Sequence, residues 1–159
     1  MFSRILVPLD GSKFASRALD VAFEVAEYFS AELILVRVIH PVKTPLIAAG
    51  TYSETISAQS AELAMEIALK DEARRKKQAE RYLKRKVRTV CQTVPISWEV
   101  ATGQPGKEII KLAKKRKVDL IIMSAHGTGG IKRAILGSVA DEVSRKSGKS
   151  VMIIHPRQR

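Results

Sequence analysis

The segment Ser124–Ser138 holds the residues of this chain that are best suited to binding an anion. It reads SAHGTGGIKRAILGS, contains four glycines and directly follows the apolar run DLIIM. Glycine lets a backbone approach a ligand closely, and the unpaired amides at the start of a helix attract anions. Because a helical pattern begins at Gly137-Ser138, we expect Ser138 to cap that helix. The amides of Val139 and Ala140 would then face a bound phosphate.

The spacing of the glycines excludes the two most familiar phosphate-binding loops. A Walker A loop, G-x4-G-K-[ST], would have to end at Gly148-Lys149-Ser150, but Val143 stands at its first glycine position and a strand follows. A Rossmann G-x-G-x-x-G that starts at Gly127 would place Lys132 at its third glycine. Two interpretations stay open: a two-part phosphate site formed by Gly127 and Gly137-Ser138, or a turn followed by a capped helix.

Asp10 is a second candidate binding residue, at the end of the first apolar run. The start MFSRILVPLDGS predicts a buried strand, and Asp10 or Ser12 can cap the helix that follows. A carboxylate here could accept hydrogen bonds from a ligand, although aspartate is also a common turn residue. The sequence has no Ser-His-Asp order and no paired carboxylates nearby, so it predicts no catalytic residues. It also lacks the Cys/His spacing of a metal site.

Apolar runs and helical patterns alternate along the chain, which predicts an α/β fold. The expected strands are Ser3–Leu9, Ala31–Ile39, Ile96–Ala101, Asp119–Met123 and Ser150–Ile154, and the expected helices are Lys13–Phe29, Ala61–Val90, Gly106–Arg116 and Ser138–Lys146. Short apolar strands that alternate with helices indicate a doubly wound parallel sheet with helices on both faces. Ligands of such sheets bind at the C-terminal strand edge, where Asp10 and Ser124 both fall. A single domain is expected over 1–159, with a mobile loop at 41–60.

The formal net charge of +12 is concentrated in one predicted helix. Lys70–Arg88 has ten basic and three acidic residues, and Tyr82 is its only aromatic residue. This helix (70–88) could meet an anionic partner, whether nucleic acid, an anionic membrane surface or an acidic protein, or it could simply present a solvated face. No apolar run approaches the roughly 18 residues of a membrane span, so we expect no integral membrane association. The single Cys91 and a start unlike a signal peptide predict a cytoplasmic location.

Several segments, in the same order, resemble the universal stress protein family. They are ILVPLDGSKFASRAL, LILVRVI, ATGQPGKEII and LGSVADEVSRKSGKSVMII. Nucleotide-binding members of that family carry G-x2-G-x9-G-[ST] after the fourth strand. Here Ser124 replaces the first glycine, and Gly127, nine residues and Gly137-Ser138 fit the rest. A serine at that position would be strained at positive φ and tolerated at negative φ.

The resemblance implies a fold, a ligand and an assembly. The fold would be a five-stranded sheet of order 3-2-1-4-5, of the adenine nucleotide alpha hydrolase-like kind, in a homodimer joined through the C-terminal strand 150–154. ATP would be the ligand, with Mg²⁺ or Mn²⁺ accompanying the triphosphate. Asp10 would face the ribose hydroxyls, Val38 the adenine, and Gly137 the phosphates. The implied ATP-binding residues are Pro8, Leu9, Asp10, Val38, Met123, Ser124, His126, Gly127, Gly137, Ser138 and Val139.

The sequence therefore supports three functional hypotheses. The leading hypothesis is a homodimeric ATP-binding stress-response regulator or sensor with slow or no ATP hydrolysis. The second is an interaction module without a nucleotide, which uses the basic helix on an anionic partner. The third is a nucleotide hydrolase or transferase. Each of these residues alone has an ordinary structural role: Asp10 in a turn, Val38 in the core and His126 in a loop. Only their convergence at one edge of the sheet favours a nucleotide-binding site.

Overall fold

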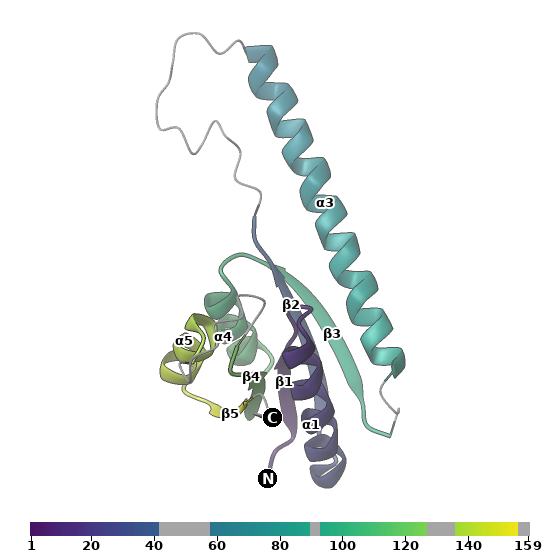
Figure 1. Cartoon of the computed structure of the whole chain (residues 1–159), viewed down its shortest axis with the longest axis vertical. Coiled ribbons are helices and arrows are strands. Elements are labelled where there is room, and N and C mark those ends of the chain that lie inside the picture. Colours follow the sequence, from purple (N-terminus) through teal and green to yellow (C-terminus); the bar gives the residue numbers. More distant parts are fainter. Residues whose placement is uncertain (42–57, 90–92, 127–135, 156–159) are drawn as a thin grey trace.

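The computed structural model describes residues 1–41, 58–89, 93–126 and 136–155. Its five strands form one parallel sheet of order β3-β2-β1-β4-β5, which confirms the predicted topology. The strands are β1 (Arg4–Pro8), β2 (Glu32–Ile39), β3 (Ile96–Thr102), β4 (Leu120–Ser124) and β5 (Ser150–Ile154). Since β1 lies between β2 and β4, the winding of the chain reverses there (Figure 1). Such a reversal is where ligands of doubly wound sheets bind.

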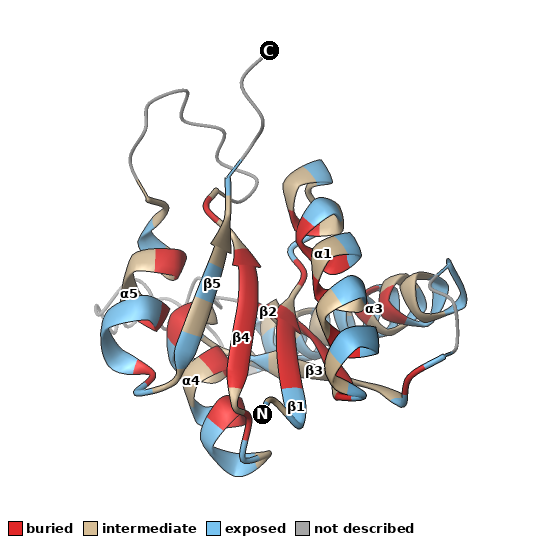
Figure 2. Ribbon diagram, turned by 90° about the horizontal axis from the view of Figure 1, so that it is seen from below, coloured by how far each residue is buried: buried red, intermediate tan, exposed pale blue. Residues whose placement is uncertain are grey.

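Two pairs of helices cover the two faces of the sheet (Figure 2). One apolar cluster joins α1 (Lys13–Phe29) and α3 (Ala58–Thr89) to the sheet, with Leu19 and Leu83 among its buried members. A second cluster joins α4 (Pro105–Lys115) and α5 (Ser138–Lys146) to the opposite face, with Ile109 and Val143 buried. Successive residues of β1 point alternately into the two clusters, as a strand buried on both faces requires.

The boundaries of the helices follow the predicted ones with small differences. Ser12 caps α1, because its side-chain oxygen accepts a hydrogen bond from the Ala15 amide at 3.0 Å. Helix α3 already includes Ala58–Ser60, so the predicted loop at 41–60 is too long at its C-terminal end. The remainder of that loop, 42–57, lies outside the described residues, as does Cys91. Among the helices that the structure describes, none is long and apolar enough to cross a membrane.

Asp119 ties the start of β4 to the start of β1. Its Oδ2 accepts hydrogen bonds from the backbone amides of Ser3, at 2.8 Å, and Arg4, at 3.0 Å. The bond from the Ser3 amide is the main reason why the pKa of Asp119 is lowered from its ordinary value; partial desolvation acts against it and the Arg4 amide adds to it.

This depressed pKa predicts an acid-dependent contribution to stability. The carboxylate stabilises the fold above its unfolded pKa of about 3.9, and the contribution disappears as the pH falls through the lower folded value. We therefore expect Asp119→Asn to be less stable than the wild type at about pH 6, with the difference shrinking below about pH 4. Urea unfolding across this pH range measures it. A difference that does not change with pH would contradict this role.

Candidate functional site

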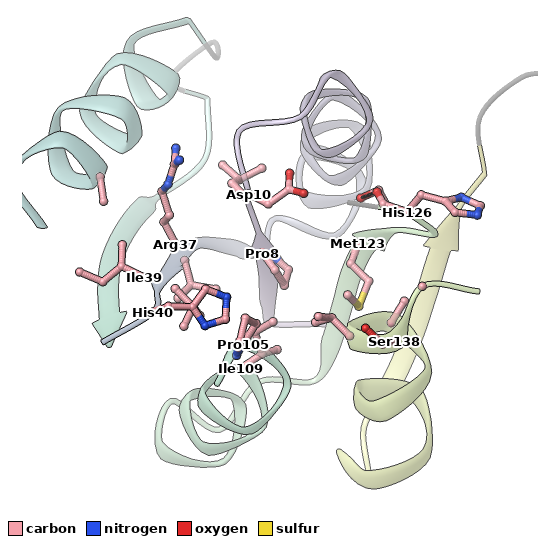
Figure 3. Close-up of a pocket in the computed structure, with 18 of the residues that line it drawn as sticks. Pro8, Asp10, Arg37, Ile39, His40, Pro105, Ile109, Met123, His126 and Ser138 are labelled. Carbon is pink, nitrogen blue, oxygen red and sulfur yellow. Dashed lines mark hydrogen bonds between the residues drawn. The ribbon is translucent and has the colours of Figure 1, made fainter. Parts of the chain in front are cut away.

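The C-terminal edge of the sheet carries a cavity of about 710 Å³ between β1, β2, β4 and the start of α5 (Figure 3). A volume of this size suits a drug-sized or nucleotide-sized ligand. Every site residue predicted from the sequence that the structure describes lines this one cavity. These residues are Pro8, Leu9, Asp10, Val38, Met123, Ser124, His126, Gly137, Ser138 and Val139. Gly127 lies outside the described residues.

Asp10 places an exposed carboxylate at the rim of the cavity. It lies two residues after the end of β1, and its Oδ1 accepts a hydrogen bond from the Ser12 amide at 2.9 Å, which holds the turn into α1. The cited hydrogen bond uses only one acceptor site of a group that has about four. Asp10 therefore keeps capacity to accept hydrogen bonds from ligand hydroxyls.

Gly137 allows the start of α5 to press against the end of β4. Its amide donates to the carbonyl oxygen of Ala125 at 2.8 Å, and an added Cβ would lie only 2.9 Å from that oxygen. Gly137 is also the N-cap of α5, whereas Ser138 is the first helical residue, so the prediction that Ser138 caps the helix was wrong by one position. The reason is that the helical turn already closes at Gly137, whose carbonyl accepts from the Asp141 amide at 2.9 Å.

A glycine N-cap makes the start of α5 available to an anion. Gly137 has no side chain to accept a hydrogen bond, and no side-chain cap is present at this helix. The first amides of a helix have no partner within the helix and carry its positive dipole end. With Ser138 and Val139 in the cavity wall, these amides can attract an anion that enters the cavity.

Ser124 occupies its position without backbone strain. Among the described residues other than glycine, only Ser30 and Lys117 have positive φ, so Ser124 does not need the freedom of glycine. It pairs with Ile154 as the last residue of β4. Its hydroxyl donates to the carbonyl oxygen of His126 at 2.8 Å, which fixes the backbone turn at the cavity edge.

His126 borders the cavity but aims its ring elsewhere. Figure 3 shows the imidazole pointing away from Asp10 and Pro8. Both ring nitrogens are buried, and neither has a hydrogen-bond partner within the part of the chain that the structure describes. The Ser124 hydroxyl holds the backbone of His126 at the edge of the cavity.

Helices α3 and α4 provide a cavity wall that the sequence did not predict. Arg75, Gln78 and Ala79 come from α3, and Pro105 and Ile109 come from α4. Pro105 could have been found, since its helix starts just after the C-terminal end of β3, at the same edge. No sequence signal pointed to the α3 residues, because their position depends on how that long helix crosses β2 and β3.

Arg37 and His40, on and just after β2, were missed as well. The Arg37 guanidinium lies 4.5 Å from the centroid of the Tyr82 ring, so it is directed toward α3 (Figure 3). Burial raises the pKa of Tyr82 while Arg37 acts in the opposite direction, so the phenol stays protonated beside the cavity at neutral pH.

The model of the Universal stress protein family matches residues 1–155. The chain belongs to this family. A universal stress protein of Methanocaldococcus jannaschii is 32% identical over 154 residues, which cover 97% of this chain and 82% of the relative. The solved universal stress protein UspA from Lactobacillus plantarum is 26% identical, with a TM-score of 0.70 and coverage of 96% and 97% of the two chains. A solved universal stress protein in complex with cAMP shares the fold at 24% identity and a TM-score of 0.65, covering 97% of each chain.

The cavity of this family member offers several kinds of contact to a ligand. Its lining combines the Asp10 carboxylate, the cationic side chains of Arg37 and Arg75, apolar side chains and the uncapped start of α5. Within the described ranges, no group of three or more His, Cys, Asp or Glu residues is placed to hold a metal ion.

Proposed function

We propose that this universal stress protein binds ATP in the cavity at the C-terminal edge of β1, β2 and β4. The observation that carries the proposal is the meeting of three groups in one cavity: the Asp10 carboxylate, the apolar wall at Val38 and Ile109, and the uncapped start of α5. The solved relative in complex with cAMP shows that another member of the family binds an adenine nucleotide. For this chain, the residues that line the cavity support the proposal.

Each group suits a different part of ATP. The Asp10 carboxylate accepts hydrogen bonds from the ribose hydroxyls. Val38, beside Ile109, gives the flat adenine an apolar contact, while Pro8, Leu9 and Met123 line the space beneath. The amides of Ser138 and Val139 hold the phosphates, and Gly127 is proposed to contribute on the same side. When Mg²⁺ or Mn²⁺ accompanies ATP, it neutralises phosphate charge.

The proposed role is that of a stress-response regulator or sensor rather than a fast enzyme. The described cavity pairs no nucleophile with a general base, so hydrolysis should be slower than about 1 s⁻¹. Faster turnover that Asp10→Ala abolishes would instead favour the hydrolase or transferase hypothesis. We also propose a cytoplasmic location, which suits a chain with a single cysteine.

We further propose that the protein is a homodimer joined through β5 (150–154). This strand is at the edge of the sheet, and its Met152 side chain is exposed while Ile153 and Ile154 are only half-buried. Light scattering after gel filtration should give about twice the chain mass of 17.6 kDa, and Met152→Lys should shift the protein toward monomer. Even a weak dimer, with a dissociation constant on the order of 100 µM, should be populated at a protein concentration near 100 µM. A wild-type protein that is only monomeric at that concentration would contradict this assembly.

Titration calorimetry with ATP tests the ligand. One site per chain with a dissociation constant below about 1 mM is expected, and ATP should bind more tightly than adenosine because α5 contacts only the phosphates. The absence of heat at millimolar ATP, with circular dichroism showing folded protein, would overturn the proposal.

Ser124→Gly restores the family's glycine and should not improve binding. Ser124 is unstrained, so glycine removes no strain; it removes the hydrogen bond to His126 and adds backbone freedom. We expect ATP affinity within about twofold of the wild type and a loss of about 1 kcal/mol in the free energy of unfolding. Calorimetry and urea unfolding measure the two quantities. A tenfold gain in affinity would show that serine impairs the site.

A further inference from the structure

Helix α3 has an outer face that the proposed ATP site does not use. The helix packs against the sheet through Ala79 and Leu83, and it lines the cavity through Arg75 and Gln78. Figure 1 shows α3 along the outer side of β3, with none of the elements drawn as ribbons beyond it. Its outer face is therefore open to a partner.

Basic side chains form one line along this outer face. Successive members are three or four residues apart, which keeps them on one side of a helix. All of them are exposed, and no acidic residue interrupts the line. The members, called here the basic stripe, are Lys70, Arg74, Lys77, Arg81, Arg85 and Arg88.

Most of the charge of the basic stripe is not neutralised by neighbouring side chains. Lys70 pairs with Glu66 at 2.6 Å and Arg74 pairs with Asp71 at 2.8 Å. Within the described chain, the other four members have no carboxylate within ion-pair distance. A row of unpaired cations attracts an anionic surface strongly.

The same line continues toward the start of α3 with two apolar side chains. Leu63 and Ile67 precede Lys70 at the same spacing, and their exposed fractions are 58% and 59%. Large apolar side chains this exposed find no packing partner in the described part of the chain. From Leu63 to Arg88 the line extends about 37 Å on a straight helix, at about 1.5 Å per residue.

We propose that this face of α3 binds an anionic lipid membrane peripherally, with the helix lying along the surface. A straight line of cations matches a plane of lipid phosphates along its whole length, and Leu63 and Ile67 can enter the boundary between headgroups and acyl chains. Nucleic acid fits less well. The phosphate strands of a duplex wind around its axis, so a straight line of cations follows neither strand along its whole length. The basic stripe also has no aromatic side chain to stack on a base, and the two apolar residues would have no role.

Cosedimentation with phospholipid vesicles, without nucleotide, tests this inference. We expect the full chain to bind vesicles containing about 30% phosphatidylserine and not vesicles of phosphatidylcholine alone. Raising salt from about 0.05 to 0.5 M should weaken binding strongly, because exposed charges become screened.

The triple substitution Lys77→Gln, Arg81→Gln, Arg88→Gln should reduce the vesicle partition coefficient on the order of 100-fold, because each cation contributes about 1 kcal/mol. The double substitution Leu63→Gln, Ile67→Gln should reduce it about tenfold or more.

A matched control separates the basic stripe from net charge. Lys107, Lys111 and Lys114 are exposed at similar spacing on α4, which covers the other face of the sheet. Their triple replacement by glutamine removes the same charge and should change the partition coefficient less than threefold, about 0.6 kcal/mol.

Equal losses of vesicle binding in both triple variants would overturn the proposal, as would no binding to the phosphatidylserine vesicles. Tight binding to a duplex DNA probe without vesicle binding would assign the face to nucleic acid instead. Because nucleotide is omitted, none of these outcomes depends on the ATP proposal.

Discussion

Asp10→Ala should lower the affinity for ATP by about 10- to 100-fold while the fold persists. The substitution removes the charged acceptor at the end of β1 that we assign to the ribose hydroxyls, and hydrogen bonds to charged groups contribute about 1.5–3 kcal/mol. Asp10 is exposed, so no core packing is lost, although the hydrogen bond to the Ser12 amide disappears. Asp10→Asn keeps an oxygen for that amide and should give an intermediate affinity. Titration calorimetry measures both variants.

Asp20→Ala is the matched control for this prediction. Asp20 is an exposed carboxylate of α1 that does not line the cavity, and its removal changes the net charge by the same amount. Its ATP affinity should stay within about twofold of the wild type. If Asp10→Ala and Asp20→Ala bind ATP equally well, the Asp10 carboxylate does not contact the ligand.

Gly137→Ala should damage the site and the fold together. The new Cβ would lie 2.9 Å from the Ala125 carbonyl oxygen, a backbone atom that cannot move away easily. The start of α5 must then shift away from β4, which costs about 1–3 kcal/mol of the free energy of unfolding. Because that start supplies the amides assigned to the phosphates, ATP affinity should fall at least tenfold. Urea unfolding and calorimetry measure the two effects.

Gly148→Ala separates the steric effect from backbone strain. Gly148 has a φ of 62° and nothing within 4 Å of an added Cβ, so alanine there costs about 1 kcal/mol of strain without a clash. It should destabilise the protein and leave ATP affinity unchanged. A Gly137→Ala variant that keeps wild-type affinity would show that the start of α5 does not hold the phosphates.

The elements that converge at the cavity were predictable because their signals are local. The apolar runs ending at Leu9 and Met123 specify buried strands, and parallel strands bring their C-terminal ends to one edge. Asp10 and Gly137 could therefore be placed at the same site from sequence alone. The full strand order came from the family resemblance rather than from the pattern of residues.

The rest of the site depends on geometry that the sequence does not specify locally. Arg75 reaches the cavity only because α3 crosses β2 at a particular angle, and propensity says nothing about that angle. The direction of the His126 ring depends on the chain just after β4, where the Ser124 hydroxyl bonds to the His126 carbonyl, and no local pattern specifies it. The position of the cap of α5 depended on which residue closes the first helical turn, a boundary that propensity places only to within one or two residues.

Mapping backbone amide chemical shifts while ATP is added tests the central claim most directly, because it locates the ligand residue by residue. We predict the largest shifts at Asp10, Val38, Ser138, Val139 and Ala140, with little change along the outer face of α3. The same shifts should shrink in Gly137→Ala. Shifts confined to α3, or none at millimolar ATP with a well-dispersed spectrum, would contradict a nucleotide site at this edge of the sheet.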